Sequence, residues 1–164
     1  MLDFFEKINI RKVLKYLLFM ALTLLLQNTL LAQLRIFGVC PLVLPAAAVA
    51  VGMFEGPVWG ACFGILMGIF GDMAFVEQNV LFTVVLPGLA FASAFISQVF
   101  VNRRMFAFLG LALGAAFITA LVQMVGTASK DSFSSAMVAV AVLQTLLSIL
   151  PAPLLYMPPA KWIK

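Results

Sequence analysis

One stretch of sequence decides the fold: residues 56–72, which read GPVWGACFGILMGIFGD. It holds no charged residue before its last position, Asp72, and four of its glycines recur at every fourth position. Those glycines are Gly56, Gly60, Gly64 and Gly68. Small residues at this spacing form a slanted stripe that lets a neighbouring helix backbone approach closely in a membrane. The stretch therefore predicts a membrane helix with a packing or partner interface, and packing within the chain is favoured over docking of a partner's helix.

The rest of the chain has the same apolar character. Of its 164 residues, 65% are hydrophobic and 10% are charged, whereas soluble domains are roughly half apolar and about a quarter charged. A soluble domain of this length cannot bury so much apolar surface, because small domains leave a large share of their surface exposed. The composition therefore predicts a single integral membrane domain over residues 1–164.

Six apolar runs are candidates for membrane-crossing helices, since about 20 residues span roughly 30 Å of hydrocarbon. The runs are about 16–34, 39–53, 57–75, 80–101, 105–126 and 136–156, and the second is short. The connections between them are brief, which makes consecutive helices antiparallel neighbours. The sequence thus predicts an all-α bundle of six transmembrane helices with no separate domain outside the membrane.

The basic residues indicate the orientation of this bundle. If the N-terminus is cytoplasmic, eight of the ten Lys and Arg residues fall in cytoplasmic segments, and Arg35 and Lys130 fall on the other side. The positive-inside rule then places both termini in the cytoplasm. Residues 1–15 form a basic lead-in, and its first ten residues are interpreted either as an amphipathic surface helix or as a frayed start of the first span. The basic residues form no continuous patch, so nucleic-acid binding is not expected.

Polar side chains inside the apolar runs are the candidate functional residues. The amides of Gln27 and Asn28 should face other helices or a cavity, because an unpaired amide in lipid is costly. Interhelical hydrogen bonding is the main hypothesis for them, and a solute site is the alternative. Asp72 is expected either to be a functional intramembrane carboxylate or to cap a neighbouring helix. By depth, its nearest donors are predicted to be the amides of Gln27 or Asn28.

We find no sequence signature of catalysis. The chain has no histidine, so the commonest general base and a common metal ligand are missing. It contains no HExxH, GxSxG, P-loop or dinucleotide-binding motif. Its two cysteines, Cys40 and Cys62, lie inside apolar runs and are interpreted as packing residues. We therefore expect no enzyme activity, no catalytic residue, no metal and no cofactor.

A segment of the chain, residues 20–75, resembles the rod shape-determining protein MreD family. It has a leucine-rich helix with Gln27 near its end, then Pro41 in a second apolar helix, then a glycine-rich third helix that closes on Asp72. The last three runs are similar only in hydropathy. The resemblance implies a non-enzymatic, multi-pass component of the bacterial cell (inner) membrane that belongs to the cell-wall elongation machinery. Besides membrane lipid, the implied partners are an MreC-like protein, the actin-like MreB, the glycosyltransferase RodA and a transpeptidase.

The alternative hypothesis is a small-solute-binding subunit of an energy-coupling-factor-type transporter. Those proteins also have six helices and a similar size. They use an Ala-xxx-Ala pattern in the first helix to meet a coupling subunit, but the first run here holds only Ala21 and Ala32. The first connection, residues 35–38, is also too short to act as a lid over a solute.

Overall fold

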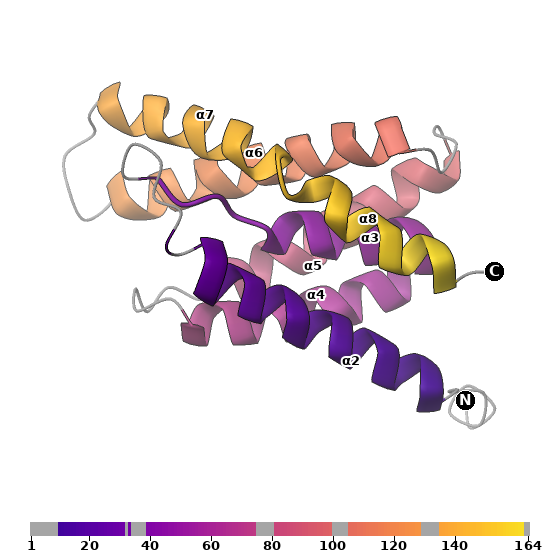
Figure 1. The fold of residues 1–164 in the computed structure, drawn as a ribbon. Helices are drawn as coiled ribbons and strands as arrows, with labels where there is room; N and C mark the ends of the chain where they lie inside the picture. The colour runs from indigo at the N-terminus through magenta and orange to yellow at the C-terminus, as the bar shows by residue number, and fades with distance from the viewer. Residues whose placement is uncertain are drawn as a thin grey trace.

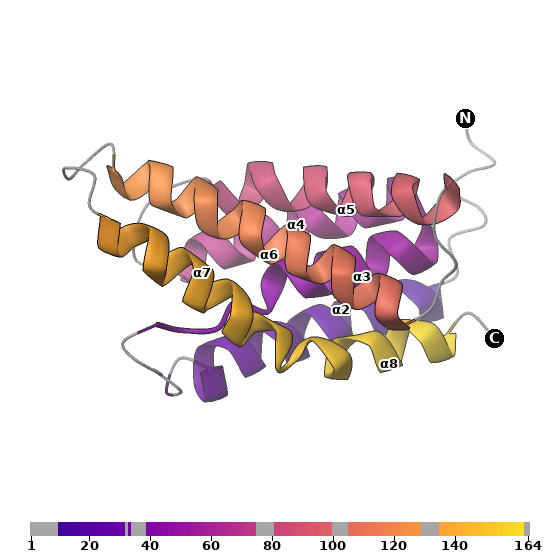
Figure 2. The ribbon, with the colours of Figure 1, turned by 90° about the horizontal axis from the view of Figure 1, so that it is seen from above.

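The computed structural model is all-α and describes residues 10–31, 33, 39–74, 81–99, 105–128 and 135–162. Figures 1 and 2 show its helices lying side by side along one common direction. In chain order they are α2 (Ile10–Leu25), the π-helical turn η1 (Leu26–Leu31), α3 (Leu44–Glu55), α4 (Pro57–Ala74), α5 (Leu81–Val99), α6 (Met105–Ala128), α7 (Ser135–Ile149) and α8 (Ala152–Trp162).

Helix α3 is the centre of the bundle. Every residue from Pro41 to Phe54 is buried, and α3 contacts α2, α4, α5, α6 and α8. Figure 1 shows it enclosed by these neighbours. Its sequence, with alanine or valine at half of its 12 positions, suits this place, because small side chains let several helices pack around one axis. A helix with no exposed face needs no polar stripe, which explains why this run is apolar all round.

The outer surface of the bundle is rich in large apolar side chains. Exposed examples come from every described helix except α3, among them Leu18 of α2, Phe70 of α4, Phe95 of α5, Phe106 of α6 and Leu154 of α8. Exposed apolar surface on this scale is typical of a protein that contacts lipid or other proteins. Helices α5 and α6 are each long and apolar enough to cross a membrane, and α7 with α8 makes a third candidate if the bent pair counts as one span.

The predicted boundaries agree with the structure for some runs and differ for others. Helices α4, α5 and α6 begin and end within two residues of the predicted runs. The first run is wrong at its start, because α2 already begins at Ile10 within the predicted lead-in. Residues 1–9, which include most of the expected surface helix, lie outside the described part of the chain.

The second and sixth runs are broken where hydropathy predicted continuous helices. Residues 39–43 are not helical, so α3 is a 12-residue helix rather than a span from residue 39. The sixth run divides into α7 and α8, which meet at an angle of 45°. Pro151 lies at that break, and it cannot donate the backbone hydrogen bond that would continue α7. Within the described residues, α3 and α4 are shorter apolar helices than the two clear candidate spans.

Candidate functional site

The glycine stripe of α4 lies against the backbones of its neighbours. A Cβ atom built on Gly64 would lie 2.8 Å from Pro87 Cα of α5, and one on Gly68 would lie 2.5 Å from Thr83 Cα. A Cβ on Gly60 would lie 2.6 Å from Gly52 Cα of α3. Real Cβ atoms are essentially never closer than 3.0 Å to such atoms, so these glycines set how closely the helices approach. We call Gly60, Gly64 and Gly68, with the backbone they face, the glycine seam.

Gly56 belongs to a turn rather than to the seam. Its φ of 99° lies in a region that other residues rarely adopt. It follows the last residue of α3, and its N–H donates to Gly52 O at 3.0 Å. The next residue, Pro57, starts α4, where a missing N–H costs nothing. This glycine reverses the chain so that α3 and α4 can pack, and it is itself buried, with Gln98 Nε2 of α5 3.7 Å from where its Cβ would lie.

Asp72 caps helix α5 at the far end of the seam. Its Oδ1 accepts a hydrogen bond from Phe82 N at 3.0 Å, and its Oδ2 accepts from Thr83 N at 2.9 Å and from Thr83 Oγ1 at 2.6 Å. These amides belong to the first turn of α5, where backbone N–H groups have no partner within the helix. A carboxylate also suits the positive end of the helix dipole. Of the two hypotheses for Asp72, this geometry is the cap, and the predicted partners Gln27 and Asn28 are wrong.

Gln27 holds the non-helical chain before α3. Its Nε2 donates to Pro41 O at 3.0 Å, and its Oε1 accepts from Val43 N at 2.9 Å. The side chain is buried and projects from the π-helical turn η1. The amide thus uses both ends on backbone groups that no helix satisfies, so its hydrogen bonds join η1 to the non-helical chain before α3 rather than to another helix. Asn28, the adjacent residue, is exposed instead, so the expectation that both amides face other helices is wrong for Asn28.

A second side chain completes this arrangement from the other side of the bundle. Ser148 Oγ of α7 accepts a hydrogen bond from Leu42 N at 2.8 Å and donates to Gln144 O at 2.7 Å. Pro41 and Pro45 have no N–H to satisfy. In the described residues, every buried side-chain nitrogen or oxygen has a hydrogen-bond partner. Irregular backbone is tolerated at membrane depth only when it is buried and satisfied in this way.

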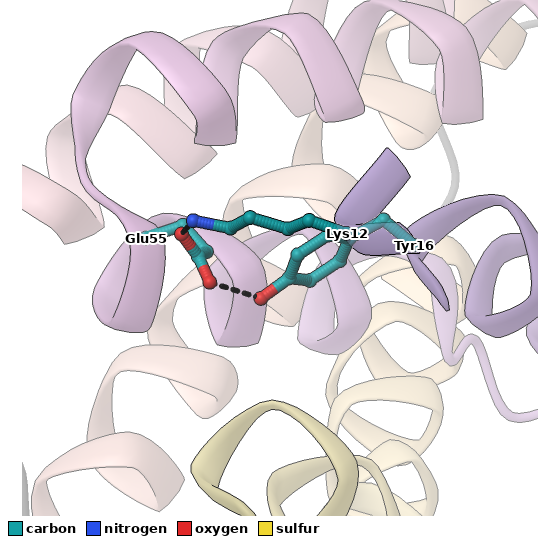
Figure 3. Close-up of polar contacts among 3 residues, drawn as sticks. All are labelled: Lys12, Tyr16 and Glu55. Atoms are coloured by element: carbon teal, nitrogen blue, oxygen red, sulfur yellow. Dashed lines mark hydrogen bonds and ion pairs between the residues drawn. The ribbon is translucent and has the colours of Figure 1, made fainter. Parts of the chain in front are cut away.

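A third polar group lies where α2 meets the end of α3, and Figure 3 shows three of its residues, Lys12, Tyr16 and Glu55, in close-up. Glu55, whose side chain is 7% exposed, forms an ion pair with Lys12. Tyr16 Oη donates a hydrogen bond to Glu55 Oε1 at 2.5 Å. The Lys12 ammonium also lies 5.4 Å from the centre of the Trp59 ring, within cation–π range. We call Lys12, Tyr16, Glu55 and Trp59 the polar latch, because it fastens α2 to α3 and α4.

The polar latch was missed at the level of sequence. By hydropathy, Glu55 falls between the second and third apolar runs, and Lys12 is one of the basic residues that indicate topology. The sequence does offer one indication, which is Glu55 itself. This acid is flanked on both sides by long apolar stretches and therefore needs a basic partner nearby. Its partners are far away in sequence: Tyr16 lies 39 positions before Glu55, and Lys12 lies one helical turn earlier still. No local pattern marks such a pair.

These features together define an all-α, largely apolar bundle with two or three helices able to cross a membrane. Among its polar side chains, Asp72 caps a helix and Glu55 fastens two helices, whereas hydroxyls such as Thr119 and Thr145 bond back to their own helix. No group of three or more His, Cys, Asp or Glu side chains that could hold a metal is present among the described residues. No family model, no curated protein and no solved structure matches the chain.

Proposed function

We propose that this chain is a non-enzymatic membrane component of the bacterial cell-wall elongation machinery, which works through helix–helix contacts with partner membrane proteins. It would cross the inner membrane six times, with both termini in the cytoplasm. The observation that carries the proposal is the run of residues 56–72, whose glycine stripe closing on Asp72 resembles the MreD family. The structure lends support by giving that stripe a physical role, namely close packing of α4 on α3 and α5.

Six crossings are supported by the way the helices are laid out. The first turn of α2 and the last turn of α8 lie at the same end of the bundle, as Figure 1 shows, which is where an even number of passes would place them. The non-helical chain of residues 39–43, which is buried except for the half-buried Cys40, extends the 12-residue helix α3 to a longer path across the bundle. The charge pattern supports the cytoplasmic side for both ends, because eight of ten basic residues are then cytoplasmic.

The outer surface of the bundle supports a function that depends on contact with other membrane proteins. The large exposed apolar side chains are available to lipid and to the helices of other membrane proteins. In the part of the chain that the structure describes, the buried polar side chains have their hydrogen-bond partners inside the bundle. A protein with this distribution has an outer surface suited to assembly, and the proposed partners are an MreC-like protein, MreB, RodA and a transpeptidase.

Depletion in a rod-shaped bacterial host tests this function directly. We expect cells to round up and widen, with insertion of wall precursors no longer confined to the lateral wall. A crosslinked pulldown from native membranes should recover cell-wall synthesis proteins. Normal cell shape with a vitamin or amino-acid requirement, and recovery of an ATPase module, would instead support the solute-binding subunit and overturn the proposal.

Topology is tested separately by fusing alkaline phosphatase or a cytoplasmic fluorescent protein after Lys164. We expect fluorescence and no phosphatase activity at this position, because phosphatase needs export. Phosphatase activity there would show that the number of crossings or the orientation is wrong.

A further inference from the structure

A half-open apolar groove runs between α2 and α4, next to the polar latch. Its volume is about 440 Å³, including the part that is open to the surroundings. Its floor and walls come from three helices and are almost entirely apolar. The lining residues are Val13, Tyr16, Leu17, Met20, Val51, Trp59, Cys62, Phe63 and Leu66. The space inside it that a water-sized atom can occupy is only about 80 Å³, so the groove is narrow, and a helix about 10–12 Å across is too wide to enter it.

One end of the groove carries a cation. Lys12 lies over the Trp59 ring that lines the groove, and its side chain is 40% exposed although Glu55 is its ion-pair partner. An ammonium has three N–H donors, so Lys12 can bind a further anion while it keeps the Glu55 contact. Arg11, the preceding residue, is exposed and adds positive charge at the same end.

A phospholipid has a charged headgroup at the membrane surface and acyl chains below it. The site has the matching order, with a cation beside a tryptophan at one end and an apolar groove after it. Tryptophan is enriched at the level of the headgroups, and basic pockets between helices bind anionic headgroups. We propose that the groove binds one acyl chain of an anionic phospholipid, with the phosphate of its headgroup at Lys12. The inference rests on the membrane location in the proposed function, but it needs neither the cell-wall role nor a particular leaflet.

Tryptophan fluorescence offers a direct test, because the chain has two tryptophans and one lines the groove. The Trp162→Phe variant leaves Trp59 as the sole reporter. The protein is reconstituted into phosphatidylcholine vesicles that contain a small share of a lipid with brominated acyl chains. The brominated lipid is phosphatidylglycerol in one set of vesicles and phosphatidylcholine in the other. We expect brominated phosphatidylglycerol to quench Trp59 at about fivefold lower mole fraction, since a basic side chain at the surface favours an anionic lipid by about that factor.

Two matched charge variants distinguish a site from general surface attraction. Lys12→Gln should abolish the preference for phosphatidylglycerol, whereas Arg11→Gln, which removes the same charge from the neighbouring position, should keep most of it. Cys62→Phe, which fills the groove without changing its charge, should lower quenching of Trp59 by both lipids. Elution as a single species from a sizing column shows that each variant is folded.

Three outcomes would overturn the proposal. Equal quenching by both brominated lipids would mean that ordinary surrounding lipid covers the groove. Equal loss of preference in the two charge variants would mean that the surface field, and not Lys12, selects the lipid. Absence of quenching in protein that floats with the vesicles would mean that protein covers the groove. Failure to float would contradict the membrane location as well, which separates that result from failure of the lipid site alone.

Discussion

Substituting one glycine of the seam by alanine has an effect that can be worked out from the structure. The Cβ of Gly64→Ala would lie 2.8 Å from both Pro87 Cα and Pro87 N, and 3.0 Å from Leu86 C. All three are backbone atoms of α5, so no side chain can rotate away. Reaching an ordinary contact of at least 3.4 Å requires α4 and α5 to separate by about 0.6 Å. Overpacking of this kind typically costs about 1–3 kcal/mol.

On the outer face of the bundle, a glycine-to-alanine substitution should raise the stability of the protein rather than lower it. A Cβ on Gly110 of α6 would meet no described atom within 4 Å. Gly110→Ala therefore keeps only the gain in helix propensity, up to about 1 kcal/mol. Because that gain applies equally to Gly64→Ala, the difference between the two variants isolates the seam. We expect Gly64→Ala to be less stable than Gly110→Ala by about 1–3 kcal/mol.

Unfolding of the purified protein in mixed micelles with increasing sodium dodecyl sulfate measures this difference. Abundance in native membranes is the companion measurement, and there we expect Gly64→Leu to be strongly depleted while Gly110→Leu is present at the parental level. If Gly64→Ala proves as stable as Gly110→Ala, the α4–α5 contact is looser than the structure indicates and the glycine seam does not set the helix spacing.

Three further predictions concern the polar contacts. Asp72→Asn should lower the free energy of unfolding only slightly, and Asp72→Leu should lower it by about 1–2 kcal/mol more, since loss of the cap leaves the first amides of α5 unpaired. Unfolding in mixed micelles ranks the two variants, and equal stability would contradict the cap. Gln27→Leu should cost about 1–3 kcal/mol, because it leaves two buried backbone groups unsatisfied, whereas Asn28→Leu at an exposed site should be close to neutral; the reverse order would refute the role of Gln27. Tyr16→Phe removes one hydrogen bond to Glu55 and should cost about 1 kcal/mol, with faster proteolysis of α2 as the readout and unchanged cleavage as the contrary result.

The sequence predicts helices well where a long apolar run is bounded by polar residues on both sides. Helices α4, α5 and α6 are of this kind, and their ends were expected within two residues. Pro57 and the acid at position 72 mark the limits of α4 clearly, because each has a physical reason to stand at a helix boundary or near one. The period of four in the glycines also predicts a close contact, although it cannot identify α5 as the helix that is contacted.

Hydropathy fails where the chain is buried without being helical. Residues 39–43 are as apolar as a helix interior, so the broken start of α3 could not be seen from their character. What permits the break is the pair of side chains that satisfy its backbone, Gln27 and Ser148, and these lie 16 residues before Val43 and 106 residues after Leu42. Such contacts depend on the whole bundle being assembled. The same holds for Glu55, whose partners come from α2.

The location of the glycine seam constrains how the proposed function can operate. Since α3 and α5 occupy the seam, its glycines are not available to a partner's helix while the bundle is folded. A partner must therefore contact the outer faces, where large apolar side chains are exposed. Substitutions in the seam should then act through the amount of folded protein, because they separate helices that stabilise one another. Substitutions that abolish partner binding at normal abundance should fall on outward-facing positions, so measuring abundance together with co-purification distinguishes packing residues from the contact surface.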